Sequence, residues 1–376
     1  MELDLNLKFE ERTTLKRIDW SFILLILALN IVGLINLYSA THGPQSEAMN
    51  GLFLNQIIWL AIGWSIFFIV TFIDYQIVTR LAYIFYFINL LALLYVTFFG
   101  HIALGAQRWI NFGFFKYQPS ETMKLAMIFV LARTLQFRST EGAGQGLKQL
   151  LWPVILILLP FALVFHQPDL GTAMMLTIIS CTMIVFMKLH RWIIIGAITA
   201  GIVALPIAWK YGLRDYQKHR ITNFLTPDND PRGTGYNSIQ SKIAVGSGKI
   251  LGKGFRKGTQ SQLEFLPERH TDFIFSVLSE EHGFLGSITT LSLFCMLFLI
   301  MIRIASTARD KFGSLLTVGV LAYVFWHMFI NMGMVIGLLP IVGVPLPLLS
   351  YGGSGMLTTM LGMGLVSSVA FRRYIF

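Results

Sequence analysis

Long apolar runs separated by short polar segments make up most of this chain. A helix that crosses a membrane needs about 20 mostly apolar residues. The runs near that length cover residues 20–39, 52–73, 80–99, 121–137, 150–165, 170–187, 192–208, 284–302, 313–337 and 352–371. The pattern predicts an all-α polytopic membrane protein with about ten transmembrane helices, in a single integral membrane domain that spans residues 1–376.

Composition supports this fold class. The chain is 55% hydrophobic and 13% charged, whereas soluble domains carry about 25% charged residues. Its two cysteines, Cys181 and Cys295, lie in apolar runs and offer no disulfide framework. The net charge of +10 fits basic loop edges that bind anionic membrane lipids, so we expect no nucleic-acid partner.

The distribution of Lys and Arg predicts the orientation. Basic residues collect in the short segments on the side of the N-terminus, which the positive-inside rule assigns to the cytoplasm. An even number of spans places the C-terminus on the same side. The long polar loop, residues 209–283, is then extracytoplasmic.

The densest mixture of charge and bulky apolar groups lies in this loop, in the stretch KGTQSQLEFLPERHTDFIFSVLSEE at residues 257–281. Its charged residues include Glu264, Glu268, Arg269, His270, Asp272, Glu280 and Glu281. A membrane loop without a task has little reason to alternate such residues so tightly. We predict that Asp272 carries the chemistry; the alternative is a helix cap before residues 273–281.

Several polar residues flank apolar runs or lie within them. Glu121 and Lys124 are three residues apart and share a helix face. Charges at membrane depth normally face the bundle interior or a water-filled cavity, so this pair either lines a functional cavity or is a structural ion pair. Asp169, in the sequence HQPDLGT, either caps the following helix or lies beside Asp272 at the outer face.

The loop between the third and fourth runs carries Arg108 and Trp109, followed by an apolar-aromatic run that predicts a short strand or hairpin. These two residues either form a rim for a headgroup or belong to an interfacial aromatic belt.

Three prolines and a double glycine interrupt residues 331–355. Irregular backbone at membrane depth is tolerated where protein or a cavity covers it. The pattern predicts a broken or re-entrant segment, with Ser350 and Tyr351 lining a cavity near the outer face; the alternative is a flexible hinge.

A glycine-rich basic stretch precedes the Asp272 segment. Its GSGK sequence lacks the GxxxxGK[ST] spacing of a phosphate-binding nucleotide loop, so we expect no nucleotide. The stretch either grips a diphosphate or is a solvated, lipid-facing charge run. The cations concerned are Lys249, Lys253, Arg256 and Lys257.

Six motifs occur in order along nearly the whole chain: GAQRW, QPSE with the following Lys124, QPDLGT, GYNSIQSKIAVGSG, FLPERHTDFIF and GVPLPLLSYGGS. Through them the chain resembles the SEDS family (shape, elongation, division and sporulation), and it is more similar to the elongation branch than to the division branch. The resemblance implies a peptidoglycan glycosyltransferase at the outer face of the bacterial cytoplasmic membrane. Such an enzyme polymerises lipid II, a disaccharide-pentapeptide on undecaprenyl diphosphate, beside a class B penicillin-binding protein that cross-links the product.

The resemblance also implies roles for single residues. The essential acidic residue of the family falls on Asp272, which we expect to act as general base with inversion at the sugar. Arg108 and Lys124 are candidates to stabilise the leaving diphosphate, with Mg²⁺ or Mn²⁺ as a candidate cofactor held by carboxylates and phosphate. The predicted substrate-binding residues are Arg108, Trp109, Glu121, Lys124, Asp169, Glu268, Ser350 and Tyr351.

Two other functions remain open at the level of sequence. A lipid II flippase would move the same substrate across the bilayer without making glycan, although the chain shows no convincing inverted repeat. A non-catalytic scaffold for the penicillin-binding protein would tolerate Asp272→Asn.

Overall fold

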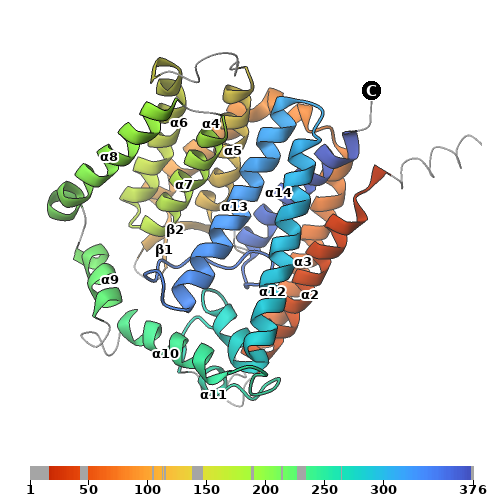
Figure 1. Ribbon diagram of the computed structural model, residues 1–376, viewed down its shortest axis with the longest axis vertical. Coiled ribbons are helices and arrows are strands. Elements are labelled where there is room, and N and C mark those ends of the chain that lie inside the picture. The colour runs from red at the N-terminus through yellow and green to blue at the C-terminus, as the bar shows by residue number, and fades with distance from the viewer. Residues whose placement is uncertain are drawn as a thin grey trace, which may run out of the picture.

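The computed structural model describes residues 17–42, 50–103, 106–111, 113, 116–137, 147–187, 190–212, 215–226, 234–263 and 265–373. Within them, long helices run side by side as a bundle (Figure 1). These are α2 (Trp20–Thr41), α3 (Asn50–Phe72), α4 (Gln76–Phe99), α5 (Pro119–Gln136), α6 (Leu147–His166), α7 (Leu170–Phe186), α8 (Arg191–Ile207), α12 (Ile274–Ser306), α13 (Lys311–Val335) and α14 (Gly353–Arg372).

Each predicted apolar run corresponds to one of these helices, which confirms the all-α polytopic fold. Among the described residues, seven helices are long and apolar enough to cross a membrane: α2, α3, α4, α6, α12, α13 and α14. Helices α7 and α8 are shorter, and α5 carries the charged residues Glu121, Lys124 and Arg133.

The eighth apolar run begins at residue 284, as expected, but a further helical segment that was not predicted precedes it. Element α12 starts at Ile274 and consists of two helical segments joined at Gly283, whose backbone is not helical (φ 65°, ψ −157°). Glu280 and Glu281 interrupt the apolar pattern there. Both are nonetheless buried, because the preceding loop folds over them.

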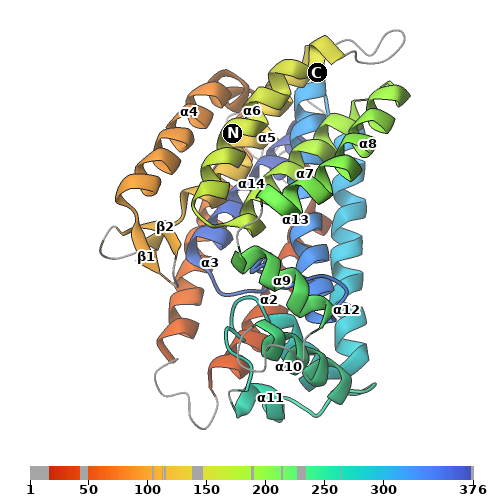
Figure 2. The ribbon, with the colours of Figure 1, turned by 90° about the vertical axis from the view of Figure 1, so that its left-hand side faces the viewer.

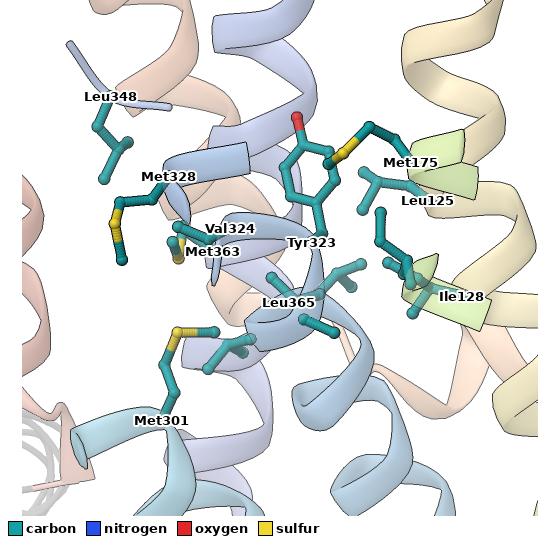
Figure 3. Close-up of a cluster of buried hydrophobic side chains, with 14 of the residues drawn as sticks. Leu125, Ile128, Met175, Met301, Tyr323, Val324, Met328, Leu348, Met363 and Leu365 are labelled. Carbon is teal, nitrogen blue, oxygen red and sulfur yellow. The ribbon is translucent and has the colours of Figure 1, made fainter. Parts of the chain in front are cut away.

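Helices α5, α13 and α14 form the centre of the bundle, and α13 packs against α5, α7, α12 and α14. Figure 3 shows Leu125 and Ile128 of α5 and Met175 of α7 beside Tyr323 of α13. Methionine fills irregular gaps between helices well, because its chain is flexible and polarizable. Because α5 is surrounded by protein, its buried charged residues Glu121 and Lys124 face other helices and avoid lipid.

The remaining elements are short. Strands β1 (His101–Ala103), β2 (Ala106–Asn111) and β3 (Lys116–Tyr117) form a small antiparallel sheet in that order, as the hairpin prediction anticipated. A π-helical turn (Ala208–Gly212) leads to α9 (Asp215–Leu225), α10 (Thr234–Ser247) and α11 (Thr259–Gln262). Figure 2 shows α9, α10 and α11 gathered at one end of the bundle, opposite the C-terminal end of the chain.

The predicted broken segment lies between α13 and α14, where residues 337–352 form turns and irregular backbone. The backbone of this segment contacts α2 and α7 closely, in each case at a glycine of the helix. A Cβ atom on Gly33 of α2 would lie 2.7 Å from Leu349 Cα, and one on Gly171 of α7 would lie 2.5 Å from the Val342 carbonyl oxygen. Only glycine permits backbone contacts this close.

Candidate active site

The backbone around Asp272 is held by residues from the far end of the chain. The carbonyl oxygen of His270 accepts a hydrogen bond from the Tyr351 N–H at 3.0 Å. That of Thr271 accepts from Ser350 Oγ at 2.7 Å, and that of Asp272 accepts from Asn331 Nδ2 at 2.8 Å. Three consecutive carbonyls are therefore fixed by α13 and by the segment 337–352.

Two of these donors also hold the irregular segment itself. Ser350 Oγ accepts from the Leu346 N–H at 2.8 Å, and Asn331 Nδ2 donates to the Val344 carbonyl at 2.7 Å. The Ser350 hydroxyl thus donates one hydrogen bond and accepts another within the protein, so it acts as a positioning group. Direct contact between Ser350 and substrate stays a prediction.

The Asp272 side chain lies in an unusual electrostatic environment. Burial is the main cause that raises its pKa to about 7; the charges of Glu268 and Asp169 add to the rise, and Arg220 opposes it. The N-cap of α12 is Phe273, and no side-chain hydrogen bond caps the helix. The structure therefore gives no support to the helix-cap alternative. A carboxyl group with a pKa near 7 is well matched to general base catalysis at physiological pH.

Glu268 lies at the exposed rim beside Asp272. Its Oε2 accepts from Thr271 Oγ1 at 3.1 Å and lies 3.9 Å from His270 Nε2. The ring centroids of His270 and Tyr351 are 5.9 Å apart. Burial lowers the pKa of His270 and raises that of Tyr351. A partly exposed carboxylate therefore lies beside the half-buried ring of His270, which in turn lies beside that of Tyr351; contact between these residues and substrate stays a prediction.

Asp169 caps α7, which was one of the two roles that its sequence position left open; its contact with substrate stays a prediction. Its carboxylate caps α7 by accepting from the Thr172 N–H at 3.3 Å and from Thr172 Oγ1 at 2.9 Å. Its charge also contributes to the raised pKa of Asp272. Arg108 Nε lies 3.6 Å from Asp169 Oδ2, and Arg108 Nη2 donates to the Pro168 carbonyl. Strand β2, which also carries the half-buried Trp109, is thereby tied to the α6–α7 turn.

A second polar cluster is buried among α5, α13 and α14. Lys124 Nζ forms an ion pair with Glu121 Oε1 at 2.7 Å, which was one of the two alternatives for this pair, and it lies 2.8 Å from His327 Nε2. All three residues are buried. The charges therefore face the protein interior, which is where ionisable residues in membrane helices are normally found.

Two cations of the basic stretch before the Asp272 segment have partners within the protein. Lys253 Nζ pairs with the fully buried Glu280 at 2.7 Å, and Arg256 Nη2 donates to the His42 carbonyl at 2.6 Å. Glu280 follows Asp272 by eight residues, about 12 Å along a helix. These two cations therefore fix the loop. Glu264 lies outside the described residues.

Arg220, His327 and Asn331 are site residues that the sequence reasoning missed. Arg220 lies on α9 in a shallow hollow with Ser238 and Ile341, and no local pattern distinguishes it from other loop cations. His327 and Asn331 interrupt an apolar run, and polar or ionisable residues at membrane depth are themselves a functional signal.

The chain is similar to known proteins along nearly its whole length. The model of the FtsW/RodA/SpoVE family, described as cell cycle proteins, matches residues 19–375. Peptidoglycan glycosyltransferase MrdB of Escherichia coli (strain K12) is 40% identical over 357 residues, covering 95% of this chain and 94% of the relative. Peptidoglycan glycosyltransferase RodA of Treponema pallidum (strain Nichols) is 32% identical, covering 94% of this chain and 98% of the relative.

Solved structures show the same fold. A chain of a peptidoglycan synthase complex, described as coordinating polymerization and crosslinking, superposes with a TM-score of 0.81 at 28% identity, covering 96% of this chain and 99% of that chain. The rod shape determining protein RodA of Thermus thermophilus superposes with a TM-score of 0.70 at 26% identity, covering 96% and 98%.

Proposed function

Because this chain belongs to the FtsW/RodA/SpoVE family, as its motifs predicted, we propose that it is a peptidoglycan glycosyltransferase that polymerises lipid II during cell elongation. The observation that carries the proposal is the Asp272 carboxyl group. Its pKa is raised to about 7, and its backbone is fixed by Asn331, beside hydrogen bonds from Ser350 and Tyr351 to the two preceding residues.

Asp272 acts as the general base in this reaction. It takes the proton from the acceptor sugar hydroxyl, whose oxygen forms a bond to the anomeric carbon of the donor. The bond between that carbon and the diphosphate breaks, the configuration inverts, and the diphosphate leaves with the electron pair. Positive charge stabilises the leaving group. Arg108 and Arg220 are assigned to contact it, whereas Lys124, which is buried in its ion pair with Glu121, contributes only through its charge.

Mg²⁺ or Mn²⁺ fits this site as a ligand shared with the substrate. No group of three or more His, Cys, Asp or Glu side chains that could hold a metal occurs among the residues the structure describes. Magnesium commonly binds one or two carboxylates together with substrate phosphates, and Glu268 would supply a carboxylate, leaving Asp272 free to act as the base. The ion would neutralise charge that develops on the diphosphate.

The proposed orientation places Asp272 on the periplasmic or external side and both termini in the cytoplasm. In support, Asp19 before α2 and Arg373 after α14 lie 3.4 Å apart at one end of the bundle. The elements α9, α10 and α11 lie at the other end (Figure 2). The polymer made there would pass to a class B penicillin-binding protein, which is the proposed partner.

The test is lipid II polymerisation by the full-length protein purified in detergent, alone and with a class B penicillin-binding protein. Wild type is expected to make glycan and Asp272→Asn to make none. Asp74→Asn is the matched control, because it makes the same chemical change in an ion pair with Arg372, away from Asp272; it should retain activity.

Two results would contradict the proposal. If wild type and Asp272→Asn made equal amounts of polymer, Asp272 would not be the general base and another residue would have to take that role. No polymer from wild type with its partner, together with lipid II movement across proteoliposome membranes, would favour a flippase.

A further inference from the structure

His327 is a buried histidine of α13 whose ring nitrogens both have partners. Nε2 lies 2.8 Å from Lys124 Nζ, and Nδ1 lies 2.7 Å from the carbonyl oxygen of Tyr323. We infer that His327 is a positioning residue of the transferase: its neutral ring holds the Lys124 ammonium group in place, from the same helix that positions the backbone of Asp272. The inference deepens the proposed function and rests on it.

The two partners determine where the ring proton lies. A carbonyl oxygen only accepts hydrogen bonds, so Nδ1 must carry the hydrogen. A lysine ammonium group only donates, so Nε2 must offer its lone pair to Lys124. A doubly protonated ring would instead place two donors 2.8 Å apart. The geometry thus requires the neutral ring with its proton on Nδ1.

This hydrogen bond completes the surroundings of the ammonium group. Lys124 Nζ also donates to Glu121 Oε1 at 2.7 Å and lies 5.3 Å from the centre of the Tyr323 ring, over its face. Lysine carries its charge on a flexible four-carbon chain, so a single partner would leave it free to swing about Glu121. The contact with His327 removes that freedom.

The same face of α13 also holds the base. His327 and Asn331 are four residues apart and therefore lie on one side of the helix, about 6 Å apart along its axis. Asn331 fixes the backbone carbonyl of Asp272, while His327 fixes Lys124. One helix therefore supports both the backbone of the general base and a buried cation, and catalytic rates are sensitive to how such groups are placed.

Two substitutions separate this role from simple packing. His327→Leu replaces the ring by an apolar side chain of similar size and removes the hydrogen-bond acceptor of Lys124. We expect kcat for lipid II polymerisation to fall about tenfold or more, with KM changed less than about twofold. His327→Gln supplies an amide oxygen as acceptor and should restore most of kcat.

Thr182→Val is the matched control. It removes the acceptor of the Trp326 Nε1 hydrogen bond, 2.9 Å long, from the same turn of α13, and it should leave kcat near the wild-type value. Equal losses in the leucine and glutamine variants, or an unchanged kcat in His327→Leu, would overturn the inference.

A second measurement needs no activity. Nitrogen-15 NMR of the full-length protein, labelled at histidine, should show one neutral ring protonated at Nδ1, assigned by its loss in His327→Gln. Lys124→Met should shift its Nε2 resonance. A ring protonated at Nε2, or at both nitrogens, would overturn the inference even in an active enzyme. Failure of the proposed function would be seen in a different experiment, the comparison of lipid II polymerisation by wild type and Asp272→Asn.

Discussion

Replacing Asp272 by asparagine is expected to abolish polymerisation and also to stabilise the folded protein at neutral and alkaline pH. The carboxyl group is half-buried and faces like charges on Glu268 and Asp169. Asparagine has nearly the same shape as the protonated acid but cannot ionise. The substitution therefore removes an unfavourable charge and leaves the packing in place.

The size of the effect follows from the shift in pKa. The group titrates at about 7 in the folded protein against 3.8 as the reference value, and each unit corresponds to about 1.36 kcal/mol. The ionised carboxylate thus costs the fold about 4 kcal/mol at most. Because the folded pKa is the higher one, the cost is negligible below about pH 4, grows between pH 4 and 7, and is complete above pH 7.

The assay is thermal unfolding of purified wild type and Asp272→Asn in one detergent, at intervals from pH 4 to pH 8. The asparagine variant should melt higher at pH 8, and the two curves should converge towards pH 4. Identical melting temperatures across this range would show that the carboxylate is not strained in the fold. A less stable variant at pH 8 would refute the electrostatic reasoning.

Other residues give further expectations. Glu268→Gln should move the acidic limb of the polymerisation pH profile to lower pH and Arg220→Met should move it to higher pH, because their charges act oppositely on the pKa of Asp272; shifts in one direction would contradict this assignment. Glu280→Ala should lower the free energy of unfolding by about 3 kcal/mol, measured by thermal or denaturant unfolding. The substitution removes a fully buried carboxylate and leaves Lys253 and two backbone N–H groups without their acceptor. Gly171→Ala should cost most of the activity by pushing the Val342 carbonyl aside, whereas Gly196→Ala, where a Cβ meets nothing within 4 Å, should cost little.

Features with a local cause could be predicted from sequence. Hydrophobic length alone located ten helices, and the three-residue spacing of Glu121 and Lys124 predicted that they share a helix face, with the observed ion pair as one of two alternatives. The motifs predicted the family, which the comparisons confirmed. The role of Asp272 as base stays a prediction, although its raised pKa is consistent with that role.

Features that depend on distant contacts could not be predicted. The polar start of α12 is a helix because the loop folds over Glu280 and because Asn36 of α2 donates to the Ile274 carbonyl. Lys253 binds Glu280 only because the loop folds in this way. Asn331 and Asp272 are 59 residues apart, and no periodicity in either segment indicates that they meet.

The three carbonyls held beside Asp272 have a consequence for turnover. A polymerase must admit a new substrate in every cycle, and a loop that had to order itself each time would lose conformational entropy at each addition. Here the main chain at His270, Thr271 and Asp272 is already ordered by Tyr351, Ser350 and Asn331. The ordering cost is met once, when the protein folds, and each further sugar is added to a preorganised site.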